Sequence, residues 1–144
     1  QNYNGYCFIG STLWSQVKYT HYKMNDRPEI KGLEYEIYSQ MNNSCIDFLY
    51  DTMNKKKDKK CIIMTHHLPS EKLFGEKYIK ECGQWFFTNM EEFLMKYNES
   101  IKGWFCGHTF IQNDIIINNV RILCNPIGYV GQYNIVDFNK IVEL

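Results

Sequence analysis

Three histidines follow two short apolar runs, and their types and spacing could form a metal site. His66 and His67 come one residue after the run 61–64, and His108 comes one residue after 101–106. Apolar residues that follow one another without polar alternation are typical of buried strands. The carboxyl ends of strands are where open α/β sheets usually carry their sites, and neutral imidazoles suit zinc, manganese or iron. The alternative for each histidine taken alone is a buried structural side chain with satisfied hydrogen bonds.

The other strands expected from the sequence indicate a mixed α/β fold. Strands are expected over residues 6–9, 61–64, 101–106, 114–117, 120–124 and 133–138. Asn118 and Asn119 tolerate positive φ and predict a two-residue hairpin turn. Strands and helices alternate at first, and an antiparallel hairpin follows. The pattern predicts mixed sheets flanked by helices, in a single domain over residues 1–144 or in the carboxyl-terminal portion of one.

Two helices are expected between these strands. The first starts at Ser44, with Asn43 or Ser44 as its cap, or begins earlier near Leu33 and breaks around 42–43. Its apolar positions are Cys45, Phe48, Leu49 and Met53. The second starts at a capping box over residues 88–91, with Met90, Phe93, Leu94 and Tyr97 as its apolar stripe. The long connections over residues 16–31 and 69–87 are loops, and the second could line a substrate cleft.

Charge and composition exclude some classes of function. Lysine plus arginine (16) equal aspartate plus glutamate (16), so the formal net charge is zero. A neutral chain has no overall electrostatic attraction for nucleic acid, and no nucleic-acid partner is expected. No apolar stretch reaches membrane-spanning length and no signal peptide opens the chain, so no membrane association is expected. The six cysteines form no C-x-x-C pair and are expected to be reduced, in a cytoplasmic protein. Because Gln1 is not an initiator methionine, the chain is expected to be a fragment or a processed form.

Four short motifs occur in a fixed order along the chain. They are G-S-T-L-W-S at residues 10–15, T-H-H-L-P-S at 65–70, W-F-C-G-H-T at 104–109 and C-N-P-I-G-Y at 124–129. Together they resemble the carboxyl-terminal half of calcineurin-like metallophosphoesterases, especially a bacterial-type branch with T-H-H-x-P-S and N-P-x-G-Y. The resemblance extends from about Phe8 to Phe138.

The resemblance implies a fold, a cofactor and roles for five residues. Family members are similar in having two facing mixed sheets flanked by helices, a four-layer αββα sandwich of which this chain would be half. The resemblance implies a pair of divalent transition metal ions, Mn, Fe or Zn, acting on a phosphoester substrate. His66 and His108 match metal ligands, and His67 matches a catalytic position beside the metal or facing the substrate. Asn125 and Tyr129 match a loop near the cleft and are candidate substrate-binding residues.

Two departures from the family pattern limit what the chain can do alone. Phe110 stands where the family usually has the second histidine of G-H-x-H, and phenylalanine cannot coordinate a metal. The amino-terminal motifs D-x-H, G-D-x-x-D and G-N-H-[DE] are absent. His66 and His108 give two ligands, whereas catalytic zinc usually has three from protein. The remaining ligands are therefore expected from an absent upstream segment or another chain, and this chain alone is not expected to hydrolyse phosphoesters.

Two other functions stay open at this point. A degenerate phosphoesterase fold kept as a binding or structural module is favoured by Phe110 and by the high aromatic share, 16%. A nucleic-acid-binding module is a distant third, because the only basic run is at residues 55–60 and the net charge is zero.

Overall fold

Six strands in the described part of the chain form one mixed sheet. The computed structural model describes residues 1–17, 30–74, 85–128, 137 and 139–143. The strands are β1 (Asn2–Tyr3), β2 (Tyr6–Ser11), β3 (Lys60–Thr65), β4 (Ile101–Cys106), β5 (Asn113–Ile117) and β6 (Val120–Cys124), in the spatial order β1-β2-β3-β4-β6-β5. The helices are α2 (Tyr35–Lys56), the short 3-10 helix η2 (Glu71–Leu73) and α4 (Glu91–Tyr97). The predicted α/β class with a mixed sheet flanked by helices is confirmed.

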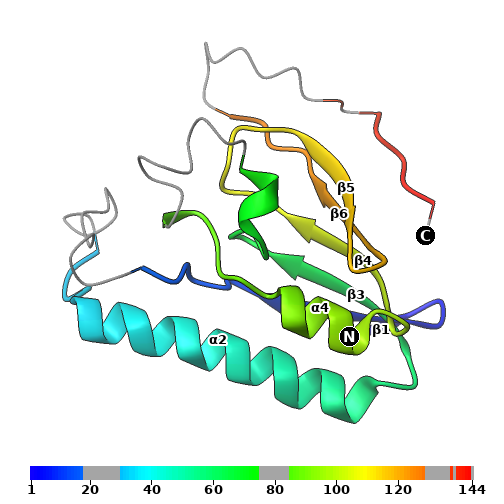
Figure 1. Ribbon diagram of the computed structural model, residues 1–144, viewed down its shortest axis with the longest axis horizontal. Coiled ribbons are helices and arrows are strands. Elements are labelled where there is room, and N and C mark those ends of the chain that lie inside the picture. The colour runs from blue at the N-terminus through cyan, green and yellow to red at the C-terminus, as the bar shows by residue number, and fades with distance from the viewer. Residues whose placement is uncertain (18–29, 75–84, 129–136, 138, 144) are drawn as a thin grey trace.

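The four central strands run parallel, and this direction creates the edge where the site lies. β2 pairs with β3, β3 with β4, and β4 with β6, all in parallel. β1 and β5 are antiparallel strands at the two sides of the sheet. α2 connects β2 to β3, and α4 connects β3 to β4 (Figure 1). The carboxyl ends of all four parallel strands therefore meet at one edge of the sheet.

The hydrophobic core lies between the sheet and the two α-helices, which cover the same face (Figure 1). Leu49 and Met53 of α2 and Phe93 of α4 are fully buried there, against Ile63 and Trp104 of the central strands. The opposite face is less covered by the described residues. Met64, which follows Ile63 and so points the other way, is 50% exposed, and Phe8 and Phe105 are only partly buried.

The first helix follows one of the two predicted starts but is continuous. α2 begins at Tyr35, after Glu34 as N-cap, close to the alternative start near Leu33. It runs unbroken to Lys56, so a start at Ser44 and a break at 42–43 are both wrong. Asparagine disfavours helix interiors because its side chain competes for nearby backbone groups. Here the Asn42 side chain is buried and hydrogen-bonds groups outside the helix, Trp14 and Thr88, so this competition does not arise. Phe48 is also less buried than predicted, at 46% exposure.

The predicted capping box of the second helix is also wrong. α4 begins at Glu91, and its first N–H donates to the side-chain oxygen of Asn89 at 3.0 Å. The Thr88 hydroxyl binds the Trp14 carbonyl instead of the helix. The apolar stripe was predicted correctly, since Met90, Phe93, Leu94 and Tyr97 are all buried.

Other predictions concern strands, turns and thiols. β2 continues through Gly10 to Ser11, past the predicted end at residue 9. The hairpin is confirmed, with φ of 49° at Asn118 and 64° at Asn119. Cys7, Cys45, Cys61, Cys106 and Cys124 are free thiols, as predicted, while Cys82 lies outside the described residues. The predicted strand over 133–138, apart from Asp137, and most of the two long loops (18–29 and 75–84) lie outside them as well.

None of the helices in the described ranges combines the length and the apolar character needed to cross a membrane.

The packing of α2 predicts different costs for two neighbouring truncations. Leu49→Ala removes a fully buried side chain and should lower the free energy of unfolding by about 2–5 kcal/mol. Phe48→Ala, one residue earlier and 46% exposed, should lower it by clearly less, although it removes more atoms. Urea denaturation followed by circular dichroism measures both. Equal losses would contradict the placement of α2 against the sheet.

Candidate metal centre

The two histidine-bearing segments leave neighbouring parallel strands and are joined by a backbone hydrogen bond. His66 follows β3 directly, and Gly107 follows β4 directly. The Gly107 N–H donates to the His66 carbonyl at 3.0 Å. Because the two strands end side by side, His66 and His108 are brought together although they are far apart in sequence.

The imidazole rings of His66, His67 and His108 form one cluster. His66 Nε2 lies 3.0 Å from His108 Nδ1. The ring centroid of His67 lies 5.0 Å from that of His66 and 4.3 Å from that of His108. One nitrogen from each residue lies within 4.8 Å of the other two. The convergence of His66 and His108 is thus confirmed, and His67 joins them.

His67 has one ring nitrogen bound and the other without a partner. Its Nδ1 lies 3.3 Å from the carbonyl oxygen of Thr12, the residue after β2. A carbonyl oxygen can only accept, so Nδ1 carries the proton and Nε2 carries a lone pair. That Nε2 atom is buried and has no hydrogen-bond partner among the described residues. Buried polar atoms without a partner are rare and often mark a binding role.

Burial also fixes the charge of His67. The side chain is 1% exposed, and desolvation, together with the nearby His108 and His66, lowers the pKa of His67 from 6.5 to about 3. The ring is therefore neutral at physiological pH. A neutral imidazole with a free lone pair is the form that binds a metal ion.

The backbone around the histidines is held by side chains from the strands. The Thr65 hydroxyl donates to the His67 carbonyl at 2.7 Å and accepts from the Trp104 indole N–H at 2.9 Å. His108 itself adopts φ of 65°, a left-handed conformation that histidine tolerates better than most residues. Gly107 is not left-handed, and a β-carbon there would meet the His66 carbonyl oxygen at 3.7 Å, an ordinary contact. The neighbouring protein atoms therefore leave room for a side chain at Gly107.

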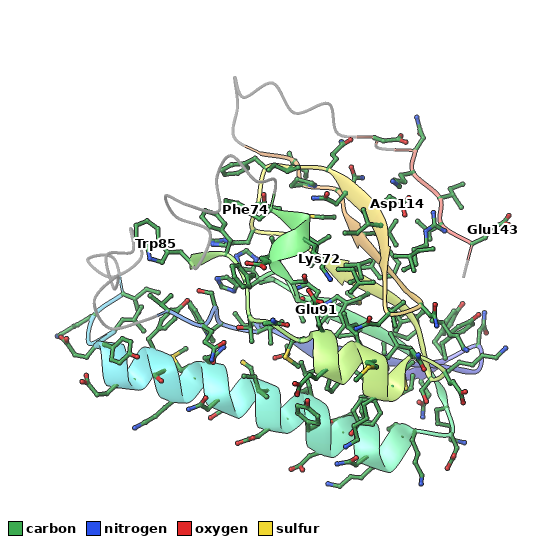
Figure 2. The ribbon with its side chains drawn as sticks, in the orientation of Figure 1. Lys72, Phe74, Trp85, Glu91, Asp114 and Glu143 are labelled. Atoms are coloured by element: carbon green, nitrogen blue, oxygen red, sulfur yellow. The ribbon has the colours of Figure 1, made fainter. Side chains whose placement is uncertain are left out.

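The loop after β3 is anchored to the start of α4. The Ser70 hydroxyl donates to Glu91 Oε1 at 2.7 Å, and Lys72 Nζ lies 2.6 Å from Glu91 Oε2. Figure 2 shows Lys72 and Glu91 pointing toward one another from η2 and α4. Lys72 is 56% exposed, so the ion pair contributes little to stability, but together the bonds restrain the segment that follows His66 and His67.

Aromatic side chains surround the imidazole cluster. The Trp14 ring lies 5.7 Å from His67, and the Phe86 ring lies 4.8 Å from His108, centroid to centroid. Phe74, labelled in Figure 2, stacks on Phe86 at 4.6 Å. At His67, which is 1% exposed, this packing lowers the local dielectric and strengthens electrostatic interactions.

The other residues expected at the site are placed differently. Asn125 follows β6 at the same edge, but its amide contacts Gln112 at 3.2 Å and the Asp137 carbonyl at 3.0 Å. Its substrate-binding role stays a prediction, and Tyr129 lies outside the described residues. Phe110, two residues after His108, is 40% exposed. No carboxylate joins the three histidines in the group found among the described residues.

The three histidines suit a divalent transition metal ion. Zinc–nitrogen bonds of about 2.0–2.1 Å place two tetrahedral ligand nitrogens about 3.4 Å apart, near the 3.0 Å between His66 and His108. Two nitrogens on one ion cannot lie more than about 4.2 Å apart, and the three nitrogens of the group lie within 4.8 Å of one another, so any ring movement needed to bind an ion is small. His66 is exposed, whereas His67 is buried and bonded to Thr12, so His66 has more freedom to move.

Comparison with known proteins supports the fold. No protein-family model and no curated protein matches the sequence. Among solved structures, the chain is similar to the phosphopantetheinyl hydrolase PptH from Mycobacterium tuberculosis, with a TM-score of 0.56 and 13% sequence identity. The match covers 80% of this chain and 43% of the PptH chain, so this chain spans less than half of that protein. The likeness is one of fold.

Several groups that hold the site were not recognised from the sequence. The carbonyl of Thr12 and the ring of Trp14 lie in the motif at residues 10–15, which carried no assigned role. Backbone carbonyls carry no sequence signal, so Thr12 could not have been found in this way. Thr65, by contrast, immediately precedes the two histidines, and a hydroxyl there can bond the backbone two residues on, a recurrent local pattern.

The lowered pKa of His67 predicts how acid affects the metal-free protein. The unfolded chain binds a proton at His67 near pH 6.5, and the folded chain only near pH 3. Between these values the unfolded state holds more protons, so the free energy of unfolding should fall as the pH falls through this window. His67→Gln should reduce the slope of the free energy of unfolding against pH by at most about 1.4 kcal/mol per pH unit. Urea denaturation at several pH values, with chelator present, measures this slope. Identical slopes would show that His67 does not stay neutral in the fold.

Proposed function

We propose that this chain is the metal-binding part of a metal-dependent phosphoester hydrolase of the calcineurin-like metallophosphoesterase type. The observation that carries the proposal is the cluster of His66, His67 and His108 at the carboxyl ends of β3 and β4. A fold similar to that of a phosphopantetheinyl hydrolase supports it. The resemblance of the four sequence motifs to those of calcineurin-like metallophosphoesterases is the reason for proposing this family.

Each imidazole of the cluster has its own part in this proposal. His66 and His108 hold the metal ion from the exposed side, and His67 offers Nε2 from the buried side while its proton stays on Nδ1 against Thr12. When bound, the ion supplies Lewis acidity to a phosphoryl oxygen and makes a water more acidic. The Trp14 ring packs against His67, and the Phe86 ring packs against His108. Manganese, iron and zinc all accept such imidazole ligands.

The third imidazole, that of His67, changes what we expect of metal binding by this chain alone. Two ligands would hold a metal weakly, whereas three histidines are a known set for catalytic zinc. We therefore infer that the chain can bind one ion without a partner. A second ion needs oxygen ligands, and no carboxylate joins the group within the described ranges.

We infer that those ligands come from an upstream segment or from another chain. Parallel sheets are usually covered on both faces. The face that carries Met64, Phe8 and Phe105 is only partly covered by the described residues, which suits the docking of a further layer. The matched PptH chain is also more than twice as long as the part that this chain matches.

A second candidate is a phosphoesterase fold that binds without hydrolysing. It is favoured by Phe110, which occupies an expected ligand position two residues after His108 and is 40% exposed. Under this alternative the complete protein binds its partner equally well with His66→Ala, and elemental analysis finds no bound metal.

Metal binding is the first test of the proposal. Isothermal titration of the chelator-treated chain with Zn²⁺ or Mn²⁺ should show one site. His66→Ala and His108→Ala should each weaken it by more than about tenfold, because a ligand matters at least as much as the groups around it. Asn43→Ala, at an exposed position of α2, is the control and should bind as the original does. Equal affinity in all variants would place the metal elsewhere.

Hydrolysis is the second test, and it uses the complete gene product. With Mn²⁺ added, it should hydrolyse a nitrophenyl phosphomonoester or phosphodiester. His108→Ala should lower kcat/KM by at least about 100-fold, since the ion contributes several kcal/mol to the transition state. Asn43→Ala, on the exposed side of α2, serves as control. A complete protein that hydrolyses neither ester and holds no bound metal would favour the binding module.

A further inference from the structure

A buried amide in the first half of α2 connects this helix to the loop that contacts His67. Asn42 is 4% exposed, and its Nδ2 donates to the Trp14 carbonyl and to the Thr88 hydroxyl, the latter at 2.8 Å. The Thr88 hydroxyl in turn donates to the same Trp14 carbonyl at 3.0 Å. Two donors from separate segments therefore converge on one backbone oxygen.

The residue before Trp14 has an unfavourable backbone conformation. Leu13 is fully buried and has φ of 51°, in the left-handed region that a bulky side chain rarely adopts. Such a conformation persists only when the surroundings hold the chain on both sides. On one side the Leu13 N–H donates to Ser11 Oγ at 3.3 Å. On the other side the Trp14 carbonyl is held by Asn42 and Thr88.

This turn directs the Thr12 carbonyl toward His67. That oxygen accepts from the His67 backbone N–H at 3.1 Å and faces His67 Nδ1 at 3.3 Å. The Trp14 ring also lies against the His67 ring. The contacts from Asn42 to His67 thus run through three consecutive residues, Thr12, Leu13 and Trp14.

We propose that Asn42 is a positioning residue for the metal centre. By holding the Trp14 carbonyl it maintains the Leu13 turn, and the turn keeps the Thr12 carbonyl on Nδ1 of His67. The Nε2 lone pair is then available on the side of His66 and His108. The inference rests on the proposed function only for the identity of the ligand, because the orientation of His67 can be measured without metal.

The experiment compares Asn42→Ala with two controls on the same helix. Met53→Ala truncates a fully buried side chain further along α2, so it reports a general loss of stability. Asn43→Ala removes the neighbouring exposed amide. For each protein, long-range ¹⁵N NMR of the histidine rings at pH 8 with chelator reports the His67 tautomer, and Zn²⁺ titration reports affinity.

In the original chain we expect a single His67 tautomer protonated on Nδ1. Asn42→Ala should show a mixture of tautomers and a Zn²⁺ affinity lower by about 10–100-fold, the range seen when a group that orients a ligand is removed. Met53→Ala should unfold at a lower temperature yet keep the tautomer and the affinity, and Asn43→Ala should change nothing. An Asn42→Ala protein with the original tautomer and affinity would overturn the proposal.

A second pair of variants covers the case in which Asn42→Ala does not fold. Thr88→Val removes one of the two donors to the Trp14 carbonyl, and Thr88→Ser keeps it. We expect a partial tautomer mixture with valine and the original spectrum with serine. If the valine and serine variants gave the same spectrum, the proposal would be overturned. If the original chain binds no Zn²⁺, the proposed function fails, while the tautomer still decides the role of Asn42.

Discussion

The parallel pairing of β3 with β4 is the constraint on which the rest of this structure depends. Parallel strands end on the same side, so the residues that follow them must meet. The hydrogen bond from Gly107 N–H to the His66 carbonyl extends the contact one step beyond the strands. With the backbones joined there, the rings of His66 and His108 lie close together. The pairing of β2 with β3 brings the Thr12 carbonyl to the same edge, where it binds His67.

A buried imidazole such as that of His67 is costly unless both of its ring nitrogens have a defined function. His67 lies in a low-dielectric environment that opposes its protonation, and one nitrogen is left without a hydrogen bond. A satisfied structural histidine would bond both nitrogens. The arrangement is therefore typical of a ligand site, where the unbonded lone pair is kept for an ion. Aromatic side chains on two sides preserve that environment.

The sequence predicted β2 to β6, though not the short β1, and it predicted the convergence of His66 and His108. Both predictions follow from local apolar runs and from the parallel direction. It failed at α2, where the propensity of Asn42 and Asn43 suggested a break. The helix is continuous because Asn42 is bonded to residues far away in the sequence, which local rules cannot take into account. It failed at Thr88 for the same reason, since its hydroxyl binds Trp14 and not the helix. The partner of His67 is a backbone carbonyl, and any residue type could supply it.

The strand order also determines when the centre can assemble during folding. The hairpin of β5 and β6 joins close neighbours such as Ile117 and Val120, whereas β2 and β3 join Tyr6 to Lys60. Local pairings close quickly, and pairings between distant segments form later because they require a large loop to be closed first. All three imidazoles depend on the distant pairings. We therefore expect the hairpin to form first, so that the three imidazoles converge late in folding and not at its beginning.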